Sequence, residues 1–187
     1  METIKTLEML FTEFGAKEYY GEEITQLEHA TQAFELAREA GADQELCIAA
    51  FLHDIGHLLD DETDALGSVD HESLGGKWLR KKDFGERVAL AAELHVLAKR
   101  YLCSTDATYQ SKLSEASVLT LAMQGGLLSN EEIAAFEENE YFQDLIWIRR
   151  WDDEAKVKDK ISLPLNYILD EIKDYLQKQE MSNPKHL

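Results

Sequence analysis

The chain has 187 residues, of which 44% are hydrophobic, and 37 acidic residues against 19 basic ones give a formal net charge of −18. This length suits one domain with its own core, and we expect a single domain over residues 1–187. The negative charge argues against nucleic acid or anionic lipid as partners, and no apolar run approaches a membrane span. The N-terminus lacks a signal-peptide layout and there are only two cysteines, so we expect a cytoplasmic protein.

Apolar residues recur at helical spacing along nearly the whole chain. The pattern predicts helices over residues 4–14 and 24–40, a third helix capped by Asp43 that carries residues 52–57, and a fourth opened by His71. Further helices are predicted over 86–98 and 116–123, after the capping box of Ser129 and Glu132, over 142–148 and over 164–179. Period-two alternation, repeats and linkers are absent from the sequence. The predicted fold is therefore all-α, a compact bundle of about eight to ten helices with a disordered polar tail from about residue 180.

The chain is organised around the stretch Leu52-His53-Asp54-Ile55-Gly56-His57, which follows an apolar run over residues 46–51. Burying ionisable side chains without partners costs on the order of several kcal/mol each. His53 and His57 are one helical turn apart, so their side chains can converge on one site together with Asp54. A metal ion is the simplest partner for adjacent imidazole and carboxylate groups.

Further histidines and one carboxylate extend this candidate site. The full set of candidate ligands is His29, His53, Asp54, His71, His95 and Asp152. Four histidines and two carboxylates exceed the needs of one metal and suit two metals bridged by a carboxylate, most naturally Asp54. Without a thiolate, the set suits iron, manganese or zinc. The alternative is that some histidines are ordinary core residues and that Asp152 is a surface charge near Arg149.

The order His…His-Asp…Asp resembles the HD-domain superfamily of all-α metalloproteins, most of which hydrolyse phosphate esters. One diiron branch instead uses dioxygen to cleave a carbon–carbon or carbon–phosphorus bond. The chain resembles the PhnZ type of organophosphonate oxygenase in that branch, in register from about Tyr19 to Asp152. The motifs that carry this resemblance are Tyr19-Tyr20-Gly21-Glu22, Gln26-Leu27-Glu28-His29, His95 with Lys99-Arg100-Tyr101-Leu102, Leu113-Ser114-Glu115-Ala116-Ser117, Gln124-Gly125-Gly126 and Arg149-Arg150-Trp151-Asp152.

The resemblance implies a mixed-valent Fe(II)/Fe(III) pair with dioxygen as cosubstrate. It assigns His29, His53, Asp54 and Asp152 to one iron, and His71, His95 and the shared Asp54 to the other. It further implies that Tyr19 caps the resting site near Glu22 until substrate displaces it. The residues implied to surround the phosphonate are His57, Lys99, Ser117 and Arg149. A cationic pocket is also sensible on physical grounds, since a doubly charged phosphonate must bind to a protein of charge −18.

The implied reaction converts a small-molecule 1-hydroxyphosphonate to inorganic phosphate and a carboxylate. Tyr20, with Tyr19 and Tyr101 near it in motif order, favours (R)-1-hydroxy-2-(trimethylammonio)ethylphosphonate, which yields glycine betaine, because aromatic faces bind a trimethylammonium well. The alternative is the free amine, (R)-1-hydroxy-2-aminoethylphosphonate, which would meet Glu22 and yield glycine. Two other classes stay open: a metal-dependent phosphohydrolase on the same scaffold, and a non-enzymatic signalling module, which would need vacant metal positions.

Overall fold

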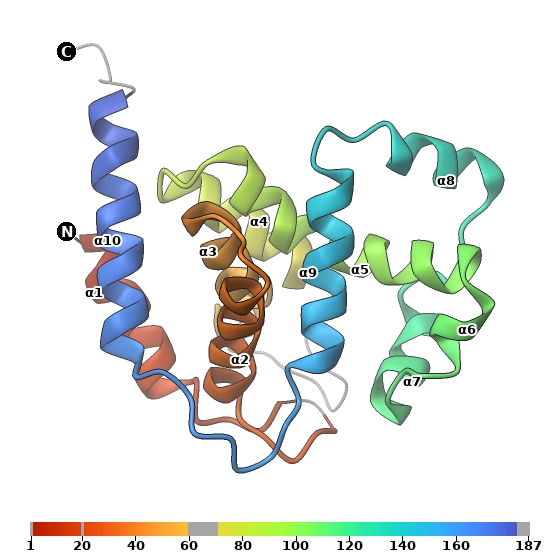
Figure 1. Ribbon diagram of the computed structural model, residues 1–187, viewed down its shortest axis with the longest axis horizontal. Helices are drawn as coiled ribbons and strands as arrows, with labels where there is room; N and C mark the ends of the chain where they lie inside the picture. The colour runs from red at the N-terminus through yellow and green to blue at the C-terminus, as the bar shows by residue number, and fades with distance from the viewer. Residues whose placement is uncertain (1, 20, 60–70, 183–187) are drawn as a thin grey trace.

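The computed structural model describes residues 2–19, 21–59 and 71–182, and the predicted all-α class is confirmed (Figure 1). Within these ranges the helices are α1 (Glu2–Glu13), α2 (Gln26–Glu39), α3 (Gln44–Leu52), the 3-10 helix η1 (Ile55–Leu58), α4 (His71–Lys81), α5 (Glu86–Thr105), α6 (Ala107–Gln110), α7 (Glu115–Met123), α8 (Asn130–Glu137), α9 (Phe142–Glu154) and α10 (Leu165–Ser182). Among the described residues, β pairing is confined to one isolated bridge between Glu18 and Thr25.

Helices α2, α3, α5 and α9 pack around the centre of the molecule, and α4 covers α5 (Figure 1). Helices α1 and α10 lie together at one side, whereas α6, α7 and α8 lie at the other. The larger hydrophobic cluster includes Phe51 and Ile148, and the smaller one, which includes Leu102 and Phe136, joins the far end of α5 to α6, α7, α8 and α9. The central helices therefore link two packed regions and can hold side chains between them.

Local capping explains where several helices begin. Thr25 and Glu28 form a capping box at the start of α2, and Asp43 accepts a hydrogen bond from the Leu46 amide at the start of α3, as predicted. The predicted capping box of Ser129 and Glu132 opens α8. At the other end of the chain α10 runs to Ser182, past the predicted end at residue 179, and residues 60–70 and 183–187 lie outside the described part.

Two helix ends differ from the prediction in ways that affect the site. Helix α3 stops at Leu52, so His53 is its C-cap and His57 lies in η1 rather than one turn further along the same helix. Helix α5 was expected to end near residue 98 but continues to Thr105. Lys99 and Tyr101 are consequently helical residues, and two positions along a helix rotate a side chain by about 200°.

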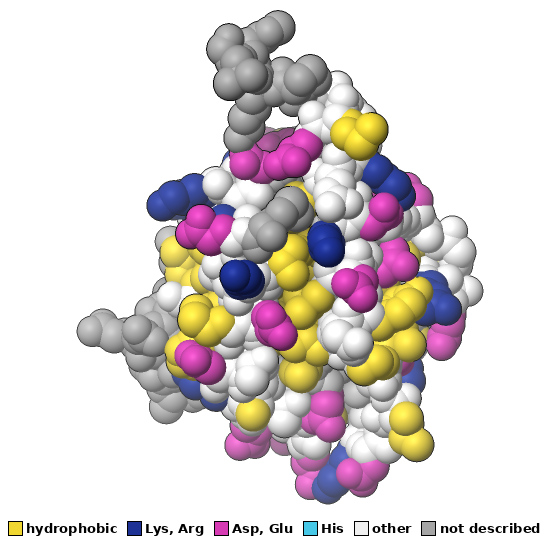
Figure 2. All heavy atoms as spheres, turned by 90° about the vertical axis from the view of Figure 1, so that its left-hand side faces the viewer, with side chains coloured by type: hydrophobic (Ala, Val, Ile, Leu, Met, Phe, Trp, Pro, Cys, Tyr) yellow, Lys and Arg dark blue, Asp and Glu magenta, His cyan; other side chains and the backbone are white. Residues whose placement is uncertain are grey.

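The face formed by α1 and α10 carries mixed acidic, basic and apolar side chains, and no histidine of the described residues is visible on it (Figure 2). The described histidines lie inward, towards α2, α3, α4 and α5. No helix in the described part of the chain is long and apolar enough to cross a membrane.

Candidate metal centre and substrate cavity

Five elements bring the six candidate ligands together. The ligands are His29 on α2, His53 and Asp54 directly after α3, His71 at the start of α4, His95 on α5 and Asp152 on α9. All six are buried, although they are separated by up to 123 residues in the chain (152 − 29). They form two groups, one of His29, His53 and Asp152 and the other of Asp54, His71 and His95, within which the candidate ligand atoms lie within 4.8 Å of one another.

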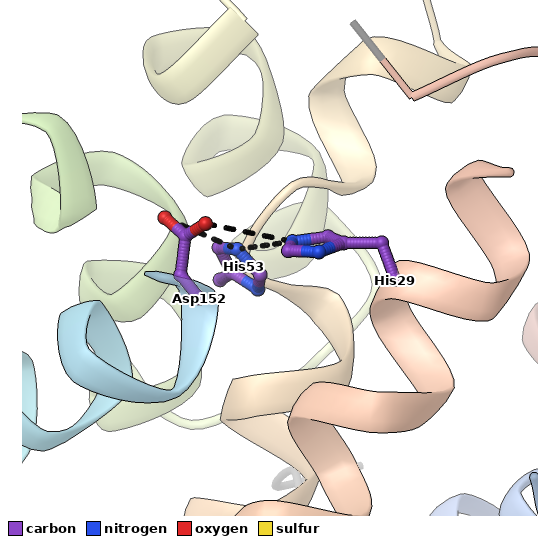
Figure 3. Close-up of side chains that lie close together, drawn as sticks. All are labelled: His29, His53 and Asp152. Carbon is purple, nitrogen blue, oxygen red and sulfur yellow. Dashed lines mark hydrogen bonds and ion pairs between the residues drawn. The ribbon is translucent and has the colours of Figure 1, made fainter. Parts of the chain in front are cut away.

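The first group converges from α2, α3 and α9 (Figure 3). The Nε2 atoms of His29 and His53 are 3.3 Å apart. The Asp152 carboxylate faces both rings, with Oδ1 3.6 Å from His29 Nε2 and Oδ2 3.7 Å from His53 Nε2. Two imidazole nitrogens and a carboxylate thus surround one position.

Asp54 lies between the two groups. Its Oδ2 atom is 3.6 Å from His29 Nε2 and 3.5 Å from His53 Nε2. Its Oδ1 atom is 3.1 Å from His95 Nε2 and 3.8 Å from His71 Nε2, and those two nitrogens are 3.2 Å apart. Each oxygen of this carboxylate therefore faces a different pair of imidazoles, which is the arrangement of a bridging ligand.

Hydrogen bonds at the far side of the rings point the Nε2 atoms inward. Three Nδ1 atoms contact backbone carbonyls: His29 with Ala155 at 2.9 Å, His53 with Ala50 at 2.7 Å and His95 with Ala92 at 2.8 Å. The fourth, His71 Nδ1, is 3.3 Å from Glu72 Oε2. The three carbonyl contacts place the ring protons of His29, His53 and His95 on Nδ1, so their Nε2 lone pairs face the candidate centre.

This arrangement fits a pair of metal ions. Two Nε2 lone pairs at 3.2–3.3 Å repel unless a cation lies between them. The Oδ1 atom of Asp54 is buried and accepts no hydrogen bond from the described residues, even though His95 Nε2 is close, because the His95 proton is on Nδ1. Imidazole and carboxylate donors without a thiolate suit iron, manganese or zinc.

Burial and the two carboxylates set the charge states. Burial lowers the pKa of His29 to about 4, so its imidazole is neutral at pH 7 and can act as a ligand. Burial raises the pKa of Asp54, but the electrostatic effect of the surrounding imidazoles, that of His53 first, outweighs burial and holds this pKa well below its usual range. Burial likewise opposes ionisation of Asp152, and Arg149 reverses the balance and lowers its pKa. Both carboxylates are therefore ionised.

Tyr19 covers this centre from a tight hairpin loop before α2. The loop is closed by hydrogen bonds from the Tyr19 amide to the Ile24 carbonyl and from the Glu22 amide to the Tyr19 carbonyl. Gly21 has φ +69°, and an added Cβ would lie 3.0 Å from Ala116 Cβ, so the turn requires glycine. The Tyr19 ring stacks on His29 at 3.9 Å, and its hydroxyl donates to Asp54 Oδ2 at 3.1 Å and contacts Asp152 Oδ1 at 3.3 Å.

A cavity of about 840 Å³, including its opening to solvent, lies beside the two groups. Its lining includes six residues for which the sequence predicts a capping or substrate-binding role, namely Tyr19, Glu22, His57, Lys99, Ser117 and Arg149. Lys99 and Arg149 are only 3% and 4% exposed, so neither is an ordinary surface charge.

The two buried cations are held differently. Lys99 donates to Thr120 Oγ1 at 3.0 Å, and burial together with the charge of Arg149 lowers its pKa to about 8. Arg149 donates to Asp152 Oδ2 at 2.6 Å and also bonds Asp153 and Tyr109. Arg149 thus connects the cavity to a carboxylate of the candidate metal centre.

His57 lies at the cavity but outside both ligand groups. Its ring stacks on His71 at 3.8 Å, and burial lowers its pKa to about 3. The prediction that His53 and His57 lie one turn apart on the same helix is therefore wrong, because α3 ends before His53. His57 is placed by η1 as a neutral side chain that can hydrogen-bond to a ligand in the cavity.

The sequence predicts that Tyr20 and Tyr101 lie near the substrate, and the structure does not support this for either residue. Tyr101 was expected near the substrate, but its hydroxyl donates to Glu137 at 2.7 Å and its ring packs on Phe136 and Phe142. The physical reason is that α5 continues past Lys99 and turns Tyr101 to the opposite side. Tyr20 lies outside the described residues.

The sequence interpretation missed Lys156, which also lines the cavity. Its Nζ atom is 3.4 Å from Glu22 Oε1 and donates to Ser117 Oγ at 3.3 Å. The signal for it is weak, because Lys156 follows the last ligand by four residues and lies beyond the end of α9. Only the contact between distant segments distinguishes it from the many lysines at the surface.

Comparison with known proteins agrees with this site. The HD domain family model matches residues 26–123, more than half of the chain, and the match contains all the candidate ligands except Asp152. A hydroxymethylphosphonate dioxygenase from Gimesia maris is 44% identical over 162 residues, covering 84% of this chain and 80% of its own.

Two further relatives cover similar lengths. The 1-hydroxy-2-(trimethylamino)ethylphosphonate dioxygenase (glycine-betaine-forming) of Leisingera caerulea is 37% identical over 158 residues, 80% of this chain and 78% of its own. An uncharacterized protein of Acanthamoeba polyphaga mimivirus is 38% identical over 181 residues, 94% of this chain and 83% of its own. Two of these three relatives are thus phosphonate dioxygenases by name. The chain belongs to the HD-domain family and, within it, to the PhnZ-type oxygenases.

Proposed function

We propose that this protein uses dioxygen to cleave the C–P bond of a 1-hydroxyalkylphosphonate, releasing phosphate and a carboxylate. The observation that carries the proposal is the position of Asp54 between two imidazole pairs, next to a cavity lined by buried Lys99 and Arg149. A two-metal centre and a cationic cavity together suit oxidation of a dianionic substrate. The names of two relatives, both phosphonate dioxygenases, support the same class of reaction.

The overall reaction balances without another reductant. One 1-hydroxyalkylphosphonate dianion and one O2 give one carboxylate, one hydrogen phosphate dianion and one proton. The carbon that carries the hydroxyl group is oxidised by four electrons to the carboxylate level, and O2 takes up those four electrons. Both oxygen atoms of O2 are accounted for in the products.

His29, His53, Asp54 and Asp152 would hold one iron ion, and His71 and His95 would hold the other with Asp54 shared. A mixed-valent Fe(II)/Fe(III) pair would supply the binding and activation of O2. The chain contributes a buried position that excludes bulk water, and the Nδ1 contacts of His29, His53 and His95 fix the orientation of these three imidazoles. Tyr19 closes the centre until substrate arrives, since its hydroxyl is bonded to Asp54.

His57, Lys99, Ser117 and Arg149 would bind the phosphonate. Arg149 offers a planar guanidinium suited to two phosphonate oxygens, whereas Lys99 acts as a point charge. Arg149 already bonds Asp152, so it can orient substrate and metal ligand relative to each other. His57 and Ser117 add neutral hydrogen-bonding groups at the same cavity.

The narrower proposal from the sequence is the trimethylated substrate that yields glycine betaine, with the free amine as its alternative. Of the three aromatic residues behind it, Tyr19 lines the cavity, Tyr101 does not, and Tyr20 lies outside the described residues. One relative carries the name of a glycine-betaine-forming enzyme, and another acts by name on hydroxymethylphosphonate, which has no amine. The substituent on the hydroxyl-bearing carbon is therefore the variable to test.

The test is phosphate release by iron-loaded protein in air from four compounds. These are hydroxymethylphosphonate, 1-hydroxy-2-aminoethylphosphonate, its trimethylammonium form and a phosphate monoester of similar size. The proposal expects release from at least one hydroxyphosphonate, and the narrower proposal expects the trimethylated compound to have the highest kcat/KM. Release from the monoester alone would assign the protein to the phosphohydrolases that share this scaffold.

A further inference from the structure

Glu22 and Lys156 form an ion pair inside the cavity. Lys156 Nζ lies 3.4 Å from Glu22 Oε1, and the two side chains are 12% and 18% exposed, respectively. This Glu22 oxygen is buried and accepts no hydrogen bond from the described residues. A buried carboxylate is destabilised unless a cation lies close to it, and the Lys156 ammonium group is that cation.

The backbone on both sides of Lys156 is fixed to α2. The Ala155 carbonyl contacts His29 Nδ1 at 2.9 Å, and Val157 exchanges two hydrogen bonds of 2.9 Å with the side chain of Gln32. The Lys156 side chain therefore starts from an anchored position. From there its Nζ atom contacts Glu22, bonds Ser117 Oγ at 3.3 Å and lies 5.8 Å from the centre of the Tyr19 ring.

We propose that Lys156 is a specificity-determining residue, an internal ammonium group that occupies Glu22 and competes with an ammonium group on the substrate. This inference rests on the proposed function and deepens it. The ammonium group of an amine-bearing hydroxyphosphonate can reach Glu22 only by displacing Lys156 or by sharing the Glu22 carboxylate with it. A substrate without an amine leaves the ion pair intact. The pair thus disfavours ammonium substituents relative to uncharged ones.

The competition is strongest for a primary ammonium, because its N–H groups need the same carboxylate oxygen that Lys156 occupies. A trimethylammonium has no N–H donor, so it loses only the electrostatic attraction that Lys156 neutralises. The order of sensitivity to Lys156 is therefore the primary amine first, the trimethylated amine second and hydroxymethylphosphonate last. This order separates the proposal from a general role of Lys156 in folding or phosphonate binding, which would affect all three alike.

The experiment compares kcat/KM for 1-hydroxy-2-aminoethylphosphonate with kcat/KM for hydroxymethylphosphonate in iron-loaded wild type and Lys156→Met. The ratio of the two values should rise about five- to tenfold in Lys156→Met, as expected for removal of one competing charge in a partly buried site. Lys156→Arg keeps the charge and should keep the wild-type ratio. In a Glu22→Gln background the Lys156→Met substitution should leave the ratio unchanged, because the carboxylate for which the two ammonium groups compete has been removed.

The neighbouring pair of Lys158 and Glu23 supplies a matched control. Its Nζ–Oε1 distance is 3.2 Å, but its side chains are 56% and 80% exposed. Lys158→Met should leave the ratio within twofold of wild type. An unchanged ratio in Lys156→Met, with phosphate still released, overturns the proposal for Lys156 alone. Absence of phosphate release from every hydroxyphosphonate in wild type overturns the proposed function and this inference with it.

Discussion

The hydroxyl group of Tyr19 donates a hydrogen bond to Oδ2 of Asp54 across 3.1 Å, joining residues that are 35 positions apart in the chain. It also contacts Asp152, so one phenol touches two carboxylates of the candidate metal centre. Burial and the charges of Asp152 and Asp54 raise the pKa of Tyr19, so the phenol is neutral and able to donate. Substrate that binds to the same centre has to break these contacts.

Removing the Tyr19 hydroxyl should therefore tighten substrate binding. Tyr19→Phe keeps the ring that stacks on His29 but cannot donate to Asp54. We expect the Kd for hydroxymethylphosphonate, titrated without oxygen against iron-loaded protein, to fall about tenfold, since a hydrogen bond to a charged group contributes about 1.5–3 kcal/mol. An unchanged or weaker affinity would mean that Tyr19 does not have to leave for substrate to bind.

The two ligand groups predict different metal contents for single substitutions. His71→Ala removes one imidazole from the group of Asp54, His71 and His95 and should leave about one iron per chain in place of two. Asp54→Ala removes the residue that faces both groups and should leave less than one. Metal analysis after loading under anaerobic conditions measures both, with His57→Ala as the control that retains two. Activation by zinc or magnesium alone, with iron inert, would contradict a diiron centre.

Lys99 predicts a loss of activity at alkaline pH. Its pKa of about 8, lowered by burial and by Arg149, means that the ammonium group proposed to bind the phosphonate is lost as the pH rises through 8. We expect kcat/KM to fall above pH 8 in wild type and to fall only at higher pH in Lys99→Arg, whose guanidinium stays charged. An identical alkaline limb in both proteins would assign it to another group.

The lowered pKa of Lys99 predicts that folding stability rises with pH where activity falls. The unfolded lysine, with an ordinary pKa of 10.5, binds more protons than the folded one between pH 8 and 10.5, so this group makes stability rise with pH in that window. Below pH 8 the folded protein carries a buried charge at a cost. Lys99→Met should therefore raise the Tm at pH 7 while it lowers kcat/KM for phosphonates. A lower Tm would show that the contact of Lys99 with Thr120 outweighs burial of the charge.

Arg149 should be sensitive even to conservative change. Arg149→Lys keeps a positive charge but cannot bond Asp152, Asp153 and a phosphonate at once. Losing one charge-assisted contact costs about 1.5–3 kcal/mol, so kcat/KM should fall about ten- to hundredfold. Arg150→Lys, at the exposed neighbouring position, is the matched control and should stay close to wild type. Near wild-type kinetics for Arg149→Lys would mean that the guanidinium does not touch substrate.

The convergence of the candidate ligands could be predicted from the sequence because burial of His53 and Asp54 beside an apolar run has few physical explanations. The helices were predictable for a similar reason, since caps such as Asp43 and the apolar period act locally. Helix ends were less predictable. The apolar pattern does not reveal that α3 stops at Leu52 or that α5 continues to Thr105.

The parts that sequence reasoning missed depend on contacts between distant segments. Tyr101 was placed near substrate because it follows Lys99 closely, but the helix turns it towards Glu137. Lys156 was not predicted because nothing in its local sequence marks it, and its proposed role follows only from its contact with Glu22, 134 residues earlier (156 − 22). Proximity in a motif predicts proximity in space only when the backbone conformation between the residues is known.

Dependence of phosphate release on dioxygen tests the central claim most directly. Iron-loaded protein should release phosphate from its preferred hydroxyphosphonate in air, with one O2 consumed for each phosphate, and release should stop in an anaerobic chamber and resume when air is admitted. Asp54→Ala, which disrupts both ligand groups, should release none under either condition. Equal phosphate release with and without oxygen would contradict the account and identify a hydrolase.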